Sequence, residues 1–107
     1  MEAVAYKQKN AYQGYKTNEI IGLTPVQLIL KLYDYVIVNS KRRDLSKVNA
    51  GLTQLVAALN FDYKEISLGF FRLYRYCQNE ARKGNFEEVV SIIGELRSSW
   101  AEAFKLS

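Results

Sequence analysis

The chain has 107 residues, of which 49% are hydrophobic and 24% are charged, and its net charge is +4. These ordinary values predict one globular domain and exclude a chain that is disordered throughout. The sequence holds one cysteine, Cys77, which excludes an internal disulfide and suits a reducing compartment.

Two features of the sequence bear on membranes. The N-terminal segment Met1–Lys7 lacks the apolar core of a signal peptide. The longest mostly apolar run, Val26–Val38, is interrupted by Gln27, Lys31 and Asp34, so it is too short and too charged to span a bilayer. We therefore expect no membrane span.

The positive charge is concentrated in the first part of the chain. Residues 1–60 carry eight Lys/Arg and four Asp/Glu, whereas residues 61–107 carry seven of each. The excess lies near the N-terminus and at Lys41-Arg42-Arg43, which we interpret as a solvated helix end, where cations suit the negative end of the helix dipole. A nucleic-acid site normally needs more clustering, so no nucleic-acid partner is expected.

Residues 1–22 differ from the rest of the chain. They are polar and contain Tyr6, Tyr12 and Tyr15 but few aliphatic residues. Aromatic residues in a polar, non-periodic segment usually dock against something, so we predict an N-terminal arm over 1–22.

The first predicted helix has a strong start signal. Thr24 is placed to be its N-cap, Pro25 to be its first residue and Gln27 to complete a capping box. The helix is expected to continue to about Arg42. A second helix is expected to begin near Asp44 or Ser46 and to end at Asn60.

Two further helices follow. Asp62 and Glu65 form a second possible capping box, and Gly84 suits the left-handed residue that ends a helix. Asn85 and Glu88 open a last helix whose apolar period continues for five turns. Short connections favour antiparallel neighbours, so the predicted fold is all-α: an antiparallel up-down four-helix bundle over 23–107.

Catalytic and metal-binding chemistry is poorly represented. The chain contains no histidine, no CxxC pair, no glycine-rich phosphate loop and no Glu-x-x-His motif. Cys77 lies on the apolar stripe of the third helix, where it is expected to be a small buried hydrophobic residue. We therefore expect no enzyme activity, no catalytic residues, no metal site and no cofactor.

Five motifs, the fourth of them in two parts, resemble, in order, the flagellin-specific export chaperone family, FliS. They are Asn10–Tyr15 with its Tyr-x-x-Tyr spacing, Leu23–Ile29 with its Thr-Pro opening, Leu32–Asp34, Leu59–Asp62 followed by Leu73–Tyr76, and Glu95–Ala103. The stretch between Leu32–Asp34 and the third helix is shorter than in the family, and the segment before Tyr12 is longer.

The resemblance implies a cytoplasmic chaperone that holds the C-terminal segment of flagellin and delivers it to the flagellar export gate. It also implies that an N-terminal segment covers part of the binding surface and yields to the client. Carried onto this sequence, that role falls to Tyr12 and Tyr15, with Ile20 as an extension.

The helices themselves indicate where a client would bind. The first helix has a second apolar stripe of Leu30, Tyr33 and Ile37, and the third has Leu68 and Phe71 off its main stripe. This is more apolar surface than one core needs, which predicts a groove for an amphipathic helix. The alternative is that the second stripe belongs to the inner core of a central helix.

Two other functions remain open at this stage. A nucleic-acid-binding or regulatory domain would use Lys41-Arg42-Arg43 with Lys47, and its binding would depend steeply on salt. A structural bundle would cover the extra apolar stripe with its own copy, and the same surface would allow the client-free chain to self-associate.

Overall fold

The computed structural model describes residues 25–105, and these form four helices and no strand. They are α2 (Pro25–Lys41), α3 (Leu45–Ala57), α4 (Lys64–Arg82) and α5 (Phe86–Ala103). The predicted all-α fold with four helices is confirmed. The predicted arm over 1–22 and the predicted N-cap Thr24 lie outside the described residues.

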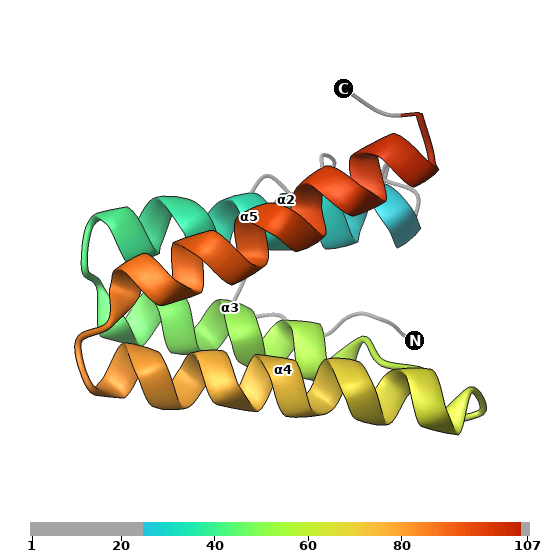
Figure 1. The fold of residues 1–107 in the computed structure, drawn as a ribbon, viewed down its shortest axis with the longest axis horizontal. Helices are drawn as coiled ribbons and strands as arrows, with labels where there is room; N and C mark the ends of the chain where they lie inside the picture. The colour runs from blue at the N-terminus through green and yellow to red at the C-terminus, as the bar shows by residue number, and fades with distance from the viewer. Residues whose placement is uncertain (1–24, 106–107) are drawn as a thin grey trace.

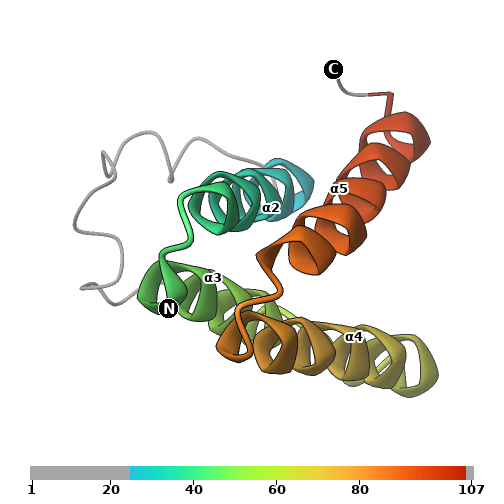
Figure 2. The same cartoon turned by 60° about the vertical axis from the view of Figure 1, so that its left-hand side comes forward.

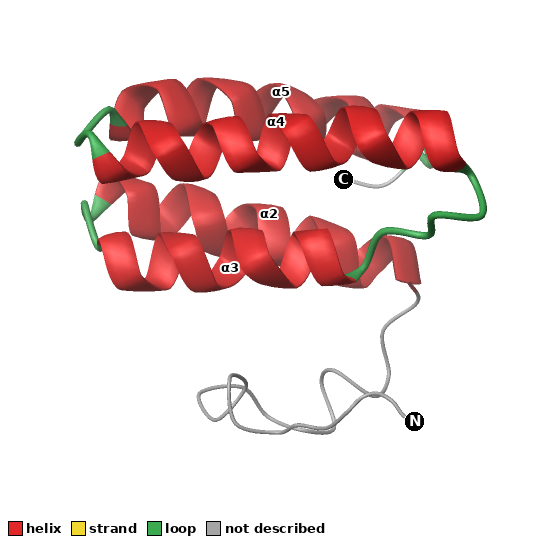
Figure 3. Ribbon diagram, turned by 90° about the horizontal axis from the view of Figure 1, so that it is seen from below, coloured by secondary structure: helices red, strands yellow, loops and turns green. Residues whose placement is uncertain are grey.

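The four helices form a ring in which each packs against two neighbours. α2 lies between α3 and α5, and α4 lies between the same two helices (Figures 1 and 2). In Figure 1 the chain reverses direction at each connection. Two short connections, α2 to α3 and α4 to α5, lie at one end, and the longer α3–α4 connection lies at the other (Figure 3). The pairing of α4 with α5 is the least extensive of the four.

The start of α3 is as predicted, because the Asp44 side chain is its N-cap. The backbone N–H of Lys47 donates to Asp44 Oδ1 at 3.1 Å. The predicted capping box at the start of α4 is wrong. The N-cap of α4 is Tyr63 and no side chain caps the helix, so Asp62 and Glu65 do not act as predicted.

Asn60 explains why these boundaries differ. Its Oδ1 accepts the Asp62 N–H at 2.9 Å, and its carbonyl oxygen accepts the Ser67 hydroxyl at 2.5 Å. An asparagine that bonds nearby backbone groups favours a turn over a helix. As a result α3 ends at Ala57, before Asn60. The N-cap of α4 is Tyr63 instead of Asp62, so α4 begins one residue later than predicted, at Lys64.

Gly84 ends α4 as predicted, with φ of 87°. Its N–H donates to Ala81 O at 2.9 Å, and the Asn85 N–H donates to Glu80 O, also at 2.9 Å. These two bonds form a Schellman motif, which satisfies carbonyl groups that the helix end would leave free.

The end of α2 repeats this motif with an arginine in place of glycine. Arg43 has φ of 58°; its N–H donates to Ser40 O at 3.0 Å, and the Asp44 N–H donates to Asn39 O at 2.9 Å. A left-handed conformation is unfavourable for a residue with a Cβ atom, so Arg43 needs compensating contacts.

The Arg43 side chain supplies those contacts by joining the two turns at this end of the bundle. Nη1 lies 3.0 Å from Glu87 Oε2, and Nη2 donates to Gly84 O at 2.8 Å. The guanidinium carbon lies 5.0 Å from the centre of the Phe86 ring. The α2–α3 turn is therefore linked directly to the α4–α5 turn.

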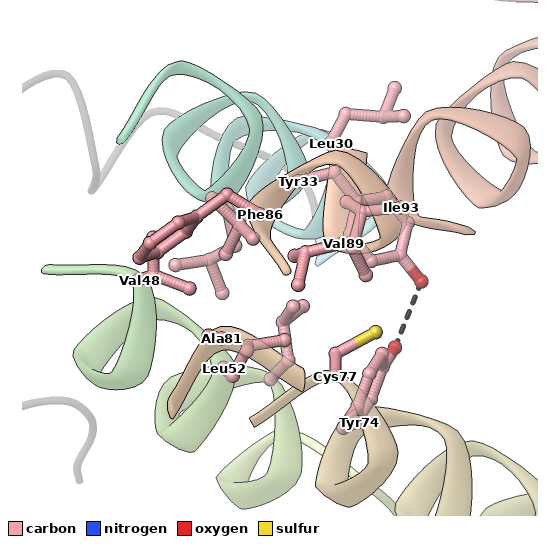
Figure 4. Close-up of a cluster of buried hydrophobic side chains, with 13 residues drawn as sticks. Leu30, Tyr33, Val48, Leu52, Tyr74, Cys77, Ala81, Phe86, Val89 and Ile93 are labelled. Carbon is pink, nitrogen blue, oxygen red and sulfur yellow. Dashed lines mark hydrogen bonds between the residues drawn. The ribbon is translucent and has the colours of Figure 1, made fainter. Parts of the chain in front are cut away.

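The core lies inside the ring and takes side chains from every helix (Figure 4). Its largest fully buried residues include Tyr33, Leu52, Leu55 and Ile93. Gly51 allows α3 to approach α2 closely, because a Cβ atom at that position would lie 2.7 Å from Val36 Cγ2.

Candidate partner-binding surface

Helices α4 and α5 are held together near their connection. Asn85 Nδ2 donates to Glu80 Oε1 at 2.8 Å, and the Tyr76 hydroxyl donates to Glu88 Oε2 at 3.0 Å. The bond from Asn85, followed by one from Lys83, lowers the pKa of Glu80. Asn85 is the N-cap residue of α5, as predicted, but its side chain bonds Glu80 and makes no capping bond.

Away from this connection the two helices diverge, as Figure 2 shows. An open groove of about 670 Å³ lies where they separate. Its apolar lining residues are Leu73 from α4 and Ile92 and Leu96 from α5, all half-buried. Glu95, Ser98 and Ser99 add a polar edge on α5. An apolar groove with a polar edge matches the surface that an amphipathic helix covers.

Tyr33 of α2 reaches both of the diverging helices. Its hydroxyl oxygen lies 2.8 Å from that of Tyr74 on α4 (Figure 4), and its ring lies edge-on to Trp100 of α5 at 6.2 Å. Burial raises the pKa of Tyr33, with a further rise from the bond to Tyr74. The fully buried Tyr33 ring thus lies between Tyr74 of α4 and Trp100 of α5. Its bulk prevents the two helices from approaching more closely at this point.

A series of aromatic rings runs from α4 through Tyr33 of α2 to the end of α5. Neighbouring rings have centroids 5.7–6.5 Å apart, and the series is Phe70, Tyr74, Tyr33, Trp100 and Phe104. Its centre is buried, Trp100 is half-buried, and Phe104 is 52% exposed. The aromatic surface therefore extends from the core to the open end of α5.

Two separate parts of the chain that carry the family resemblance meet where α2 packs against α5. Asp34 and Arg97 form an ion pair with Nε 2.6 Å from Oδ1, which raises the pKa of Arg97. Tyr33 contacts Trp100 in the same region. Segments 32–34 and 95–103 are thus in contact although they are some sixty positions apart in the sequence.

The structure corrects the predicted position of Leu30 and Tyr33. Both were expected to line a surface groove, but they are only 6% and 0% exposed, and both belong to the core. This part of the second apolar stripe faces the core, because α2 packs between α3 and α5. The alternative of an inner-core stripe is correct for these two residues.

The other predicted site residues have different positions. Ile37 is half-buried and packs against the core. Leu68 and Phe71 are half-buried on α4 and are absent from the groove lining. The structure therefore does not bring Leu68 and Phe71 together with Leu30 and Tyr33. Their binding to a partner stays a prediction.

The predicted contributions of Tyr12, Tyr15 and Ile20 lie outside the described residues. The sequence did not single out the apolar residues that do line the groove, because Leu73, Ile92 and Leu96 repeat with the same helical period as the core. A period shows which face is apolar, but it does not show that two packed helices diverge.

The basic triplet is partly engaged in the fold. Arg43 makes the contacts between the two turns that are described above, whereas Lys41 and Arg42 are exposed. Lys47, the fourth cation of the predicted alternative, is also exposed.

Cys77 is fully buried and has no features of a reactive thiol. Burial raises its pKa to about 12, with smaller contributions from Glu88 and Glu80. A thiol is nucleophilic only as the thiolate, so Cys77 is inert in the folded chain at neutral pH. Residues 25–105 contain no group of three or more potential metal ligands, and none of their helices is long and apolar enough to cross a bilayer.

Comparison of the chain with protein-family models, curated proteins and solved structures gave no match. The family resemblance therefore depends on the sequence segments and stays a prediction.

Proposed function

We propose that this chain is a cytoplasmic flagellar export chaperone that binds the C-terminal segment of flagellin and prevents its premature polymerisation. In this proposal it is a binding protein rather than an enzyme, and it delivers its client to the flagellar export gate. The sequence segments in family order support the identity of the client. The apolar groove between α4 and α5 is the observation that carries the proposed mode of binding.

The groove offers the client an apolar strip bordered by polar groups. Leu73, Ile92 and Leu96 are half-buried in the free chain, so a helix laid along them would remove the rest of their surface from water. Each Å² of apolar surface removed contributes about 25 cal/mol. A client that is disordered alone loses about 2–5 kcal/mol on ordering, so contact along several turns is needed.

Exposed apolar residues extend this surface toward the open end of the bundle. Ile66 in the first turn of α4 is 65% exposed, and Phe104 at the end of α5 is 52% exposed. Ile66 lies two helical turns before Leu73, at the spacing that places both on one face of α4. A long amphipathic client helix would reach beyond the groove to these residues.

Tyr33 has a supporting role in this proposal. It touches no solvent, so it is not a contact residue; it packs against Tyr74 of α4 and Trp100 of α5 and so fixes the positions of these two rings. Leu30 likewise belongs to the core. The proposed contact residues are therefore Leu73, Ile92, Leu96 and Trp100 in place of the stripe on α2.

Co-expression of the full chain with a flagellin C-terminal fragment, followed by size exclusion, tests the proposal. A one-to-one complex is expected. Leu73→Lys should prevent its formation by placing a charge in the groove, whereas Val38→Lys should not. Val38 is a matched control because it is an apolar residue of α2 that is 45% exposed and outside the groove. A chain that elutes alone, or a complex unaffected by Leu73→Lys, would contradict the proposal.

The role of the arm has its own test. If Tyr12, Tyr15 and Ile20 shield part of the apolar surface, deletion of residues 1–18 should strengthen flagellin binding and increase self-association of the free chain. Isothermal titration and sedimentation measure the two effects. Unchanged affinity together with unchanged self-association would exclude a shielding role.

A further inference from the structure

A second surface lies on α4, separate from the groove. Five residues spaced four, three, four and seven positions apart form a single stripe along this helix, and we name it the α4 basic stripe. It consists of Lys64, Leu68, Phe71, Arg75 and Arg82. This spacing follows the helical repeat, so all five residues share one face.

The cations of the stripe have no acidic partner in the described part of the chain. Lys64, Arg75 and Arg82 are exposed, and none of them forms an ion pair there. Among residues 25–105, Arg82 bonds only the side chain of Asn79. The neighbouring helix α3 supplies no compensating charge, because Leu45–Ala57 contains no Asp or Glu.

The apolar residues of the stripe lie between these cations. Leu68 and Phe71 are both half-buried and are not among the residues packed against the core. The Arg75 guanidinium carbon lies 5.9 Å from the centre of the Phe71 ring, which holds this cation over the apolar part of the stripe. The stripe therefore combines partly exposed apolar residues with cations on both sides that form no ion pair within residues 25–105.

We propose that the α4 basic stripe is a docking surface for an acidic amphipathic helix of a partner protein. Charge complementarity identifies the partner: carboxylates on its helix would pair with Lys64, Arg75 and Arg82. Its apolar residues would cover Leu68 and Phe71. A single-stranded nucleic acid stacks its bases on aromatic rings such as Phe71 but offers no aliphatic side chain to Leu68, whereas a protein helix covers both residues, so a protein helix fits the stripe better. The proposal does not depend on the proposed function, because no stripe residue lines the groove.

A synthetic helical peptide of about 20 residues, long enough to span α4, is a suitable probe. One version carries leucines on one face flanked by glutamates, and the matched version has glutamine at every glutamate. Fluorescence anisotropy of labelled peptide with the full chain measures affinity. The acidic peptide should bind at least about tenfold more tightly than its neutral match, and this advantage should shrink as salt rises from about 0.01 to about 0.15 M.

Variants locate the binding. Lys64→Glu/Arg75→Glu and Phe71→Ala should each weaken binding of the acidic peptide by about tenfold or more. Lys31→Glu/Lys47→Glu changes the net charge equally on other exposed faces and should leave affinity within about twofold. The groove variant Leu73→Lys should also leave the affinity for the acidic peptide unchanged. This variant therefore distinguishes failure of the stripe proposal from failure of the proposed function. Circular dichroism confirms that each variant is folded.

Three results would overturn the proposal. They are equal binding of both peptides, equal weakening by the two double variants, and tighter binding of a single-stranded RNA that competes for the stripe.

Discussion

The hydroxyl oxygens of Tyr33 and Tyr74 lie 2.8 Å apart inside the bundle, where the two residues are 0% and 2% exposed. This polar contact joins α2 to α4 across the ring of helices. Each phenol has one hydrogen to donate, and one of the two occupies their mutual bond. Removal of either hydroxyl leaves the other buried without this partner.

Replacement of these tyrosines by phenylalanine should therefore be strongly non-additive. Tyr33→Phe and Tyr74→Phe should each lower the free energy of unfolding by about 1–3 kcal/mol, because one buried hydroxyl loses its partner. The double variant removes both hydroxyls and should cost less than the sum of the single variants. Urea unfolding of all four proteins measures the coupling, and strictly additive losses would contradict the buried pair.

Gly51 and Gly69 offer a matched pair of glycine-to-alanine substitutions in helix interiors. Alanine favours a helix by about 1 kcal/mol over glycine. At Gly51 the new methyl group would lie 2.7 Å from Val36 Cγ2, and overpacking of this kind costs about 1–3 kcal/mol. A Cβ atom added at Gly69 would have no atom within 4 Å, apart from its chain neighbours and the backbone of its own helix.

Gly51→Ala should consequently lower the melting temperature and Gly69→Ala should raise it. Thermal unfolding monitored by circular dichroism distinguishes them. Stabilisation by Gly51→Ala would mean that α2 and α3 are not packed as closely as described.

Arg43 combines an unfavourable backbone conformation with favourable side-chain contacts, and two substitutions separate these effects. Arg43→Ala loses the contacts to Glu87, Gly84 and Phe86 but keeps the left-handed backbone. Arg43→Gly loses the same contacts but removes the strain of the left-handed backbone, which stabilises the fold by about 1 kcal/mol relative to alanine. Arg43→Gly should therefore be the more stable variant in urea unfolding. The reverse order would show that this residue is not left-handed in solution.

Glu80 should make stability depend on pH. Its hydrogen bonds from Asn85 and Lys83 lower its pKa in the folded chain. A carboxylate whose pKa is lowered by folding stabilises the fold at pH values above its unfolded-state pKa, about 4.3 for glutamate, and loses that contribution as the pH falls through the folded-state pKa.

The variant Glu80→Gln should accordingly be less stable than the unmodified chain at pH 7, and the difference should diminish below about pH 4. Chemical unfolding at a series of pH values tests this. A difference that stays constant to acid pH would show that the ionised carboxylate is not responsible.

The sequence predicted the helices well because their signals are local. Gly84 ends α4, and Asp44 caps α3, through contacts within a few residues of each. Asp62 failed as a cap because Asn60, two residues earlier, binds its backbone N–H. Two competing local signals cannot be ranked from their spacing alone.

The binding surface was less predictable because it depends on how the helices pack. Leu30 and Tyr33 have the period of an exposed stripe, yet both are buried in the core, where Tyr33 contacts Tyr74 of α4 and Trp100 of α5. Leu73 and Leu96 have the period of core residues, yet the divergence of α4 from α5 leaves them half-exposed to a groove. Helical periodicity specifies a face, whereas crossing angles determine whether that face meets another helix.

The emission spectrum of Trp100 is the most direct test of the proposed groove. Trp100 is the one tryptophan of the chain, and it is half-buried beside the groove. Addition of a tryptophan-free flagellin C-terminal fragment should shift its emission to shorter wavelength, with saturation at one equivalent, and Leu73→Lys should abolish the shift. An unchanged spectrum in a fragment complex that elutes as one species would contradict binding between α4 and α5.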